Sequence, residues 1–263
     1  MITPDKLPII SRLPEAGVSI FTVMSRMAAD YGAINLSQGF PDFAVDEKLI
    51  GLVNQFMLQG NNQYAPMAGT AELRQTISEV VLSTYGYKAD AETEITISSG
   101  ATEALYAAIA AFVSPGDEVI MFDPSYDSYD PSVRLNGGVP VHINLYPPHF
   151  QIDWDEVERR ITSRTKIIII NTPHNPTGSI LSMQDLQLLE KIVLHHGILV
   201  ISDEVYERII FDGLIHQSVL RFPGLAARSI AIFSFGKTFH ATGWKVGYAV
   251  APAYLTEEMR KTH

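Results

Sequence analysis

Short apolar runs recur along the chain from residue 94 onward, and they are the clearest structural signal in the sequence. Several of these runs lack the polar alternation of a half-buried strand, which is typical of strands covered on both faces. They predict seven β-strands, at residues 94–98, 118–122, 139–143, 166–170, 197–201, 229–233 and 246–250.

Segments with helical spacing of apolar residues lie between these runs. Residues 102–112 are rich in alanine, and residues 153–161 follow a polar turn. Residues 182–195 form a third helical pattern, with Ser182 as a candidate cap and Asp185 in the first turn. This alternation predicts an α/β fold, in which a mostly parallel seven-stranded sheet is sandwiched by helices.

The first forty-odd residues differ in character, because proline and glycine interrupt them repeatedly. We predict an N-terminal arm and loop over residues 1–45 and a large domain over residues 46–263. The chain has 263 residues, which is enough to bury a sizeable core.

Composition narrows the possible functions. Hydrophobic residues make up 46% of the chain and charged residues 18%, as in soluble globular proteins. The net charge of -10 argues against a nucleic-acid partner, because phosphate backbones attract basic surfaces. The absence of cysteine excludes disulfides, thiolate metal sites and cysteine nucleophiles. No signal-peptide pattern and no apolar run of membrane-spanning length is visible, so we expect a cytoplasmic protein with no membrane partner.

Polar motifs follow several of the predicted strands, and open α/β sheets bind ligands beyond the carboxyl ends of their strands. After the first strand, Ala101 and Thr102 open a helix whose free N–H groups favour a phosphate. An ordinary glycine turn is the alternative at this place. Tyr126 follows the second strand, where it can stack on a flat ring or simply pack its own loop.

Two further motifs follow the fourth and fifth strands. Residues 171–178 form a rigid polar loop or a plain connector, and Asn175-Pro176 within it is a candidate cis bond. Asp203 ends a buried strand, where a carboxylate needs a cationic or N–H partner, structural or functional. Tyr206 lies about one helical turn further and can face the same pocket.

The segment Gly236-Lys237-Thr238 is similar to the end of a nucleotide-binding loop. Such a loop needs a second glycine five positions before Gly236, but Ala231 stands there inside an apolar run. The nucleotide-binding interpretation therefore lacks a required residue. The alternative is covalent chemistry, because a lysine amine in a crowded, partly apolar pocket can form a Schiff base with an aldehyde.

Pyridoxal phosphate requires an amine for its aldehyde, a phosphate cradle, an aromatic ring to stack on and an acid at its pyridine nitrogen. Each requirement has a candidate in this sequence, at the end of a predicted strand. Ser234 and Lys245 add a hydroxyl and a positive charge for the phosphate. Each motif alone is a weak signal, but together they predict a pyridoxal phosphate site.

Seven segments resemble the class I/II aminotransferases, which are fold-type I pyridoxal phosphate enzymes. They are NLSQGFPDF (35–43), NQYAPMAG (62–69), SGATEALY (99–106), DPSYDSY (123–129), NTPHNPTG (171–178), SDEVYE (202–207) and SFGKTFHATGWKVGY (234–248). They follow in order over almost the whole chain. The second, fourth and last look most like the methionine/kynurenine aminotransferase branch.

The resemblance implies transfer of an amino group from an amino acid, such as methionine or an aromatic one, to a 2-oxo acid. It implies that Lys237 binds the cofactor covalently and moves the proton, while Asp203 holds the pyridine nitrogen protonated. Tyr206 completes the implied catalytic set. The implied cofactor contacts are Ala101, Thr102, Tyr126, Asn175, Asp203, Tyr206, Ser234, Lys237, Lys245 and Tyr64.

The same resemblance implies the substrate contacts and the assembly. Gly39, Asn175 and Phe21 are the implied substrate-binding residues. Tyr64 is similar to a tyrosine that reaches the cofactor phosphate of the neighbouring subunit, which implies a homodimer.

One departure from the family pattern concerns the C-terminal part. Family members continue through a connecting helix into a small domain, whose arginine binds the substrate carboxylate. No residue of this sequence matches that arginine, so we expect a C-terminally truncated chain that ends in the first turns of the connecting helix. An inactive or cofactor-binding-only product and a cysteine-conjugate β-lyase remain the alternatives.

Overall fold

The computed structural model describes residues 10–14, 17–39 and 43–263. The chain forms two compact units, Met1–Phe40 and Pro41–His263. In the part that the structure describes, no helix is long and apolar enough to cross a membrane.

The first unit contains helix α1 (Ile20–Asp30), which begins after Ser19. The Ser19 hydroxyl accepts a hydrogen bond from the Thr22 amide at 3.3 Å, and no residue of the helix is buried. We predicted only an arm and a loop in this region, so the helix is a correction. Its apolar residues Val23 and Met27 have helical spacing, which the neighbouring prolines and glycines obscured.

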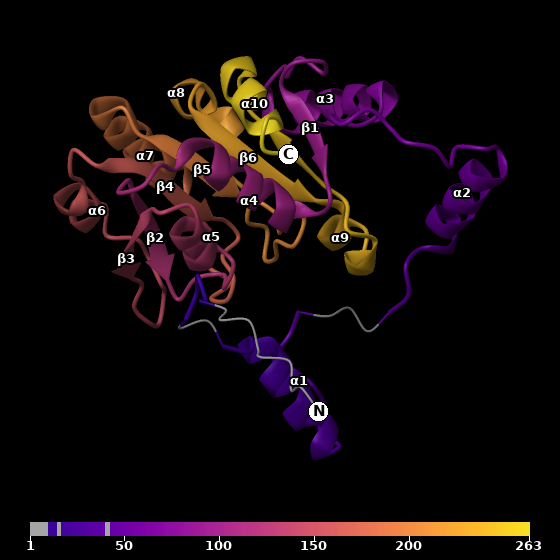
Figure 1. The fold of residues 1–263 in the computed structure, drawn as a ribbon, viewed down its shortest axis with the longest axis horizontal. Helices are drawn as coiled ribbons and strands as arrows, with labels where there is room; N and C mark the ends of the chain where they lie inside the picture. The colour runs from indigo at the N-terminus through magenta and orange to yellow at the C-terminus, as the bar shows by residue number, and fades with distance from the viewer. Residues whose placement is uncertain (1–9, 15–16, 40–42) are drawn as a thin grey trace, which may run out of the picture. The chain divides into compact units, whose positions relative to one another are not determined.

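The second unit is built on one seven-stranded sheet (Figure 1). The strand order is β1-β7-β6-β5-β4-β2-β3, and only β7 runs antiparallel to its neighbours. Each predicted apolar run forms one of these strands, which confirms the predicted fold class. The strands are β1 (Ile95–Ser98), β2 (Glu118–Asp123), β3 (Val139–Asn144), β4 (Thr165–Asn171), β5 (Leu199–Asp203), β6 (Ser229–Ser234) and β7 (Gly247–Val250).

Helices connect the strands, and the three that the sequence predicted are all present. The α-helices are α2 (Glu47–Leu58), α3 (Ala71–Tyr85), α4 (Ala101–Phe112), α5 (Tyr129–Leu135), α6 (Trp154–Arg160), α7 (Met183–His196), α8 (Pro223–Ala226), α9 (Phe235–Thr238) and α10 (Ala253–Arg260). Two 3-10 turns, η1 (Val219–Arg221) and η2 (Thr242–Trp244), complete the order.

The first turn of α7 shows why the sequence prediction succeeded there. The Ser182 hydroxyl accepts from the Asp185 amide at 3.2 Å, and the Asp185 carboxylate accepts from the Ser182 amide at 2.7 Å. This reciprocal pair satisfies two backbone donors that a helix end leaves free. Gly197, with a φ of 72°, ends the helix in a left-handed turn that glycine adopts without strain.

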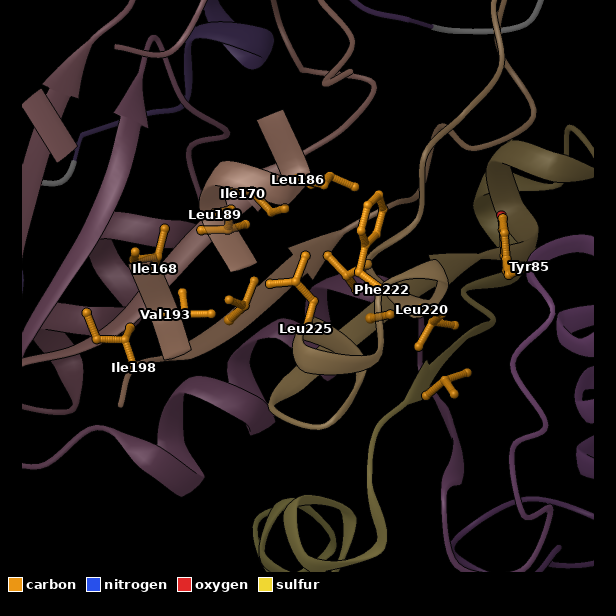
Figure 2. Packing of buried hydrophobic residues seen from close by; sticks show 14 of the residues in the cluster. Tyr85, Ile168, Ile170, Leu186, Leu189, Val193, Ile198, Leu220, Phe222 and Leu225 are labelled. Atoms are coloured by element: carbon orange, nitrogen blue, oxygen red, sulfur yellow. The ribbon is translucent and has the colours of Figure 1, made fainter. Parts of the chain in front are cut away.

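The sheet is buried on both faces, because alternate strand residues enter two separate cores. Side chains of α3, α6, α7 and α8 pack on one face, and side chains of α4, α5 and α10 pack on the other. Figure 2 shows Leu186, Leu189 and Val193 of α7 in the first core, beside Ile168 and Ile170 of β4. This double cover explains why the strands read as continuous apolar runs.

Candidate active site at the carboxyl edge of the sheet

The register of the sheet gathers polar residues at one edge. Asn171 at the end of β4 lies opposite Asp203 at the end of β5. Ser98 at the end of β1 and Ser234 at the end of β6 both lie opposite Gly247 at the start of β7. This edge is the carboxyl edge of the parallel strands, where the sequence predicted a ligand site.

Asp203 is a buried carboxyl at this edge, with 3% of its surface exposed. Its Oδ2 accepts a hydrogen bond from the Tyr129 hydroxyl at 2.6 Å, and its Oδ1 accepts from the Val205 amide at 3.3 Å. Burial raises the pKa of Asp203 to about 6, against the lowering effects of the Tyr129 hydrogen bond and of the Lys237 charge. The carboxyl is therefore poised to ionise just below neutral pH.

Lys237 is half-buried on the short helix α9, directly after β6. Burial lowers the pKa of its amine; the Asp203 carboxylate opposes this shift, and the Lys245 charge adds to it. The Nζ atom lies 5.3 Å from the centroid of the Tyr206 ring, within the range of a cation–π contact. A lysine with a lowered pKa is a better nucleophile, because more of it is neutral near pH 7.

Asn171 joins the loop after β4 to the end of β5. Its Nδ2 donates to the Asp203 carbonyl at 2.9 Å, and its Oδ1 accepts from the Asn175 amide at 2.6 Å. The Asn175-Pro176 bond is cis, as the sequence suggested. The Asn175 Nδ2 donates to the Tyr206 hydroxyl at 3.5 Å, so the predicted pair does meet.

The N-terminus of α4 forms a cradle with Lys245. Gly100 precedes the helix with a φ of 83°, and no side chain caps this end. A Cβ atom at Gly100 would lie 3.4 Å from Lys245 Nζ, so the ammonium group lies beside the first turn. Because a helix N-terminus and an ammonium group are both positive, this arrangement favours an anion between them.

Tyr126 lies next to this cradle. Its hydroxyl is 3.3 Å from the Thr102 Oγ1 on the first turn of α4. Its ring meets the Tyr129 ring edge-on, with centroids 5.6 Å apart and an interplanar angle of 77°. The predicted stacking residue therefore lies between the α4 cradle and the tyrosine that binds Asp203.

Comparison with known proteins agrees with this geometry. The family model described as aminotransferase class I and II matches residues 31–263. The chain belongs to the class I and II aminotransferases. Members of this family depend on pyridoxal phosphate, so the family and the cofactor class that the sequence predicted are confirmed.

The relatives of this aminotransferase chain include a methionine aminotransferase from Escherichia coli (strain K12), 51% identical over 96% of this chain and 66% of the relative. A probable N-succinyldiaminopimelate aminotransferase from Mycobacterium tuberculosis is 41% identical over 95% of this chain and 64% of the relative. The crystal structure of YbdL from Escherichia coli, reported as a methionine aminotransferase, matches with a TM-score of 0.94 and 50% identity over 98% of this chain and 67% of that one. The chain thus spans about two thirds of the length of these relatives.

Three further sequence-predicted residues of this aminotransferase are Tyr64, Phe21 and Gly39. Tyr64 lies between α2 and α3 with its side chain fully exposed. Phe21 and Gly39 belong to the first compact unit, Met1–Phe40. The roles of these three residues stay predictions.

Two residues of the site were missed from the sequence. The sequence predicted no role for Tyr129, which ends the segment 123–129, or for Asn171, which begins the polar loop 171–178. Both act through hydrogen bonds to Asp203, across 74 and 32 residues of chain. The only available signal was their position at strand ends that share one edge of the sheet.

The nucleotide-binding alternative has no support in the local structure. Ala231 lies inside β6, where it pairs with Ser202 and Val250. The residues before Lys237 therefore form a buried strand followed by a short helix, and not a glycine-rich loop around a phosphate.

Proposed function

We propose that this chain acts as an aminotransferase, which moves an amino group from an amino acid to a 2-oxo acid with the help of pyridoxal phosphate. The observation that carries the proposal is that a buried carboxyl and a half-buried amine interact electrostatically at one sheet edge. There, the pKa of the Asp203 carboxyl is raised and the pKa of the Lys237 amine is lowered. Opposed shifts of this kind cluster at catalytic sites.

The donor set at this edge fits the cofactor. When bound, pyridoxal phosphate supplies an aldehyde for an amine and a ring that accepts electrons. The α4 cradle suits the phosphate, the Asp203 carboxylate suits the ring nitrogen, and the Tyr126 ring suits a stacked contact. The residues that we propose to hold the cofactor are Ala101, Thr102, Tyr126, Asn175, Asp203, Tyr206, Ser234, Lys237 and Lys245, with Tyr64 from a second subunit.

Lys237 and Tyr206 have separate roles in the proposed site. The Lys237 amine would hold the cofactor through its aldehyde group, and its lowered pKa would let Nζ accept and donate a proton near neutral pH. Burial raises the pKa of Tyr206 to about 12, so its hydroxyl stays protonated and can donate a hydrogen bond to an oxygen of the bound group. The Asn175 amide, which meets the same hydroxyl, fixes the direction of this donor.

A labelling experiment tests the proposal. The purified protein is incubated with pyridoxal phosphate, reduced with borohydride and mapped by peptide mass spectrometry. We expect the pyridoxyl label on Lys237, its loss in Lys237→Ala, and no change in Lys191→Ala, which removes an exposed lysine on α7. A label on another residue, or none, would contradict the proposal.

The second part of the proposal concerns the identity of the amino-acid donor. We propose methionine or an aromatic amino acid as the donor, with Phe21, Gly39 and Asn175 as substrate contacts. The methionine aminotransferase relative supports methionine. The N-succinyldiaminopimelate relative shows that substrates vary among proteins this similar. A panel of sulfur-containing, aromatic and acidic amino acids with 2-oxo acids tests the choice. Formation of a new amino acid indicates transamination, whereas pyruvate and ammonia from a cysteine conjugate would indicate a β-lyase.

The proposal includes a homodimer that acts in the cytoplasm. Tyr64 is fully exposed in the single chain, as expected of a residue that completes the site of a second subunit. Sedimentation of the purified protein measures the oligomeric state directly.

A further inference from the structure

Tyr129 is a buried tyrosine whose hydroxyl donates a hydrogen bond to Asp203. It is the first residue of α5, it is 3% exposed, and its Oη lies 2.6 Å from Asp203 Oδ2. We propose that Tyr129 is a positioning residue, which holds one oxygen of Asp203 and so leaves the other to face the cofactor ring nitrogen in its ionised form. This inference rests on the proposed function for the identity of the cofactor.

The hydrogen bonds of Asp203 divide between its two oxygens. Oδ2 is taken by the short bond from Tyr129, at a length typical of a hydroxyl donating to a charged acceptor. Oδ1 has a long contact of 3.3 Å with the Val205 amide. Since each carboxylate oxygen accepts about two hydrogen bonds, Oδ1 retains the capacity to accept a strong one. Tyr129 therefore decides which oxygen is left for the cofactor.

The start of α5 is fixed from two sides. The Tyr129 ring packs edge-on against the Tyr126 ring. The next residue, Asp130, meets His142 Nε2 at 3.0 Å, and His142 Nδ1 lies 2.8 Å from Asp123 Oδ2 at the end of β2. This chain of contacts ties the tyrosine to β2 and β3, so its hydroxyl is held in place before any cofactor binds.

The groups around Asp203 act on its ionisation in opposite directions. Burial and the neighbouring Glu204 carboxylate disfavour the charged form. The Tyr129 hydrogen bond and the Lys237 charge favour it, and the Asp203 charge in turn helps to keep the Tyr206 hydroxyl protonated. Because the hydroxyl is the first of the lowering influences, its removal should raise the pKa of Asp203 above its present value of about 6.

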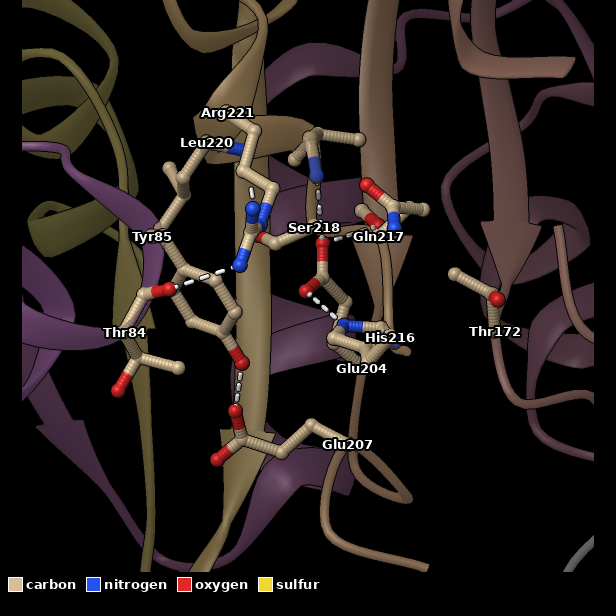
Figure 3. Close-up of polar contacts among 12 residues, drawn as sticks. Thr84, Tyr85, Thr172, Glu204, Glu207, His216, Gln217, Ser218, Leu220 and Arg221 are labelled. Carbon is tan, nitrogen blue, oxygen red and sulfur yellow. Dashed lines mark hydrogen bonds and ion pairs between the residues drawn. The ribbon is translucent and has the colours of Figure 1, made fainter. Parts of the chain in front are cut away.

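A tyrosine elsewhere in the same chain provides a matched control. Tyr85 on α3 is also buried, and Figure 3 shows its hydroxyl donating to the Glu207 carboxylate. Burial raises the pKa of this carboxyl too. Tyr85→Phe therefore removes the same kind of bond as Tyr129→Phe, but from a different carboxylate.

The first measurement needs no cofactor. Carbon-13 NMR follows the titration of the Asp203 carboxyl in the wild-type protein and in the two variants. We expect Tyr129→Phe to raise the pKa of Asp203 by about one pH unit, as the loss of one hydrogen bond to a charged group predicts. Tyr85→Phe should leave it unchanged. An unchanged pKa in a folded Tyr129→Phe protein would overturn the inference.

The second measurement adds pyridoxal phosphate and records its dissociation constant between pH 5 and pH 8. We expect Tyr129→Phe to weaken binding about twofold at pH 7 and about tenfold at pH 5, and to move the acidic limb of the curve upward by the same shift as in the NMR titration. If the role of Tyr129 were purely structural, Tyr129→Phe and Tyr85→Phe would lower the free energy of unfolding equally. The acidic limb of the cofactor-binding curve would then stay at the same pH. A wild-type protein that binds no cofactor would refute the proposed function, while the cofactor-free titration would still decide the role of Tyr129 toward Asp203.

A second substitution covers the case in which Tyr129→Phe does not fold. Incorporation of 3-fluorotyrosine at position 129 keeps the shape of the side chain and makes its hydroxyl a stronger donor. The expected change then has the opposite sign: the pKa of Asp203 falls and the acidic limb of cofactor binding moves down. A shift upward, or none, would overturn the inference.

Discussion

At the scale of single residues, the site contains ionisable side chains whose charged forms are disfavoured by burial. Asp203 is a carboxyl buried beside another carboxyl, Glu204, and its pKa is raised from 3.8 to about 6. Lys237 is an amine that burial pushes toward its neutral form. Their neighbours offset these shifts only in part, and groups with shifted pKa values cluster at functional sites.

The raised pKa of Asp203 predicts how the stability of the cofactor-free protein depends on pH. The folded state binds the Asp203 proton more tightly than the unfolded state, so the free energy of unfolding falls as pH rises from about 4 to about 6. The loss should reach about 3 kcal/mol. Asp203→Asn removes this dependence, and its stability relative to wild type should therefore be higher at pH 7 than at pH 4. Urea unfolding at both pH values measures it, and a constant difference would contradict the raised pKa.

The sequence alone indicated Lys237 and Asp203 as candidates, because Asp203 ends a buried strand and Lys237 closely follows another. Their catalytic roles stay predictions. The sequence was not sufficient to select Tyr129, whose role depends on a hydrogen bond across 74 residues. Nor did it select Asn171, since an asparagine at a strand end is equally common as a plain turn residue. Long-range partners of this kind become visible only when the order of the strands is known.

At the scale of elements, the close approach of β7 to α4 fixes the cradle for an anion. A Cβ atom on Gly247 would lie 2.7 Å from the Ala101 nitrogen and 2.8 Å from the Phe233 carbonyl oxygen. Both are backbone atoms, which cannot move aside as a side chain can. Glycine at this position therefore allows the N-terminus of α4 to lie against the edge of the sheet.

Gly247→Ala should disturb both the fold and the cradle. We expect a loss of about 1–3 kcal/mol in the free energy of unfolding, because the added methyl group overpacks a backbone contact. Affinity for pyridoxal phosphate should fall as well. Gly243→Ala is the control, since its added methyl group meets nothing within 4 Å. Equal behaviour of the two variants would show that the close contact has no such role.

The capping box of α7 gives a prediction that separates stability from function. Ser182→Ala removes the hydroxyl that caps the Asp185 amide, which should lower the free energy of unfolding by about 1 kcal/mol. Ser83→Ala, on the exposed side of α3, should change it by less than about 0.5 kcal/mol. Thermal unfolding measures both. Cofactor affinity should stay unchanged in each variant, because Ser182 bonds Asp185 and Ser83 bonds Val80, and neither partner belongs to the proposed cofactor site.

Elements with strong apolar periodicity were predictable, and those without it were not. Six of the seven strands are largely buried and appear as apolar runs, whereas the edge strand β3 has only one buried residue, Ile143. Helix α5 was not predicted, and it contains Pro131 in its first turn. Proline in the first turn of a helix is nonetheless compatible with helical structure, since its missing N–H would have no partner there. The helix forms because its buried residues Tyr129 and Val133 pack against the sheet.

At the scale of the whole molecule, helix α2 of the second unit is little covered by the rest of the unit. No residue of α2 is buried, and its apolar side chains include Leu52, Val53, Phe56, Met57 and Leu58, all of which are exposed. Large apolar patches on a protein surface usually mark an interface. Together with the exposed Tyr64 that follows this helix, they support the homodimer of the proposed function.

A mixing experiment tests whether Tyr64 completes the site of a second subunit. Tyr64→Ala chains should take up the pyridoxyl label poorly at limiting cofactor, and Lys237→Ala chains cannot take it at Lys237 at all. In a mixed dimer, the Lys237 of one chain meets the Tyr64 of the other, so one site of the two is intact. After equal mixing with subunit exchange, about half of the Tyr64→Ala chains should regain wild-type labelling.

The control for this experiment is a chain that carries both substitutions. Mixed with Tyr64→Ala, it forms dimers but supplies no Tyr64, so labelling should stay low. Recovery with this double variant would mean that dimer contacts alone restore the site, and that Tyr64 does not reach across. Labelling of the Tyr64→Ala chains could also stay low after mixing with Lys237→Ala, although sedimentation shows mixed dimers. In that case Tyr64 would belong to the site of its own subunit or to no site. Only recovery with Lys237→Ala and not with the double variant assigns Tyr64 to the cofactor of its neighbour, because the two mixtures differ in that one side chain and in no other contact.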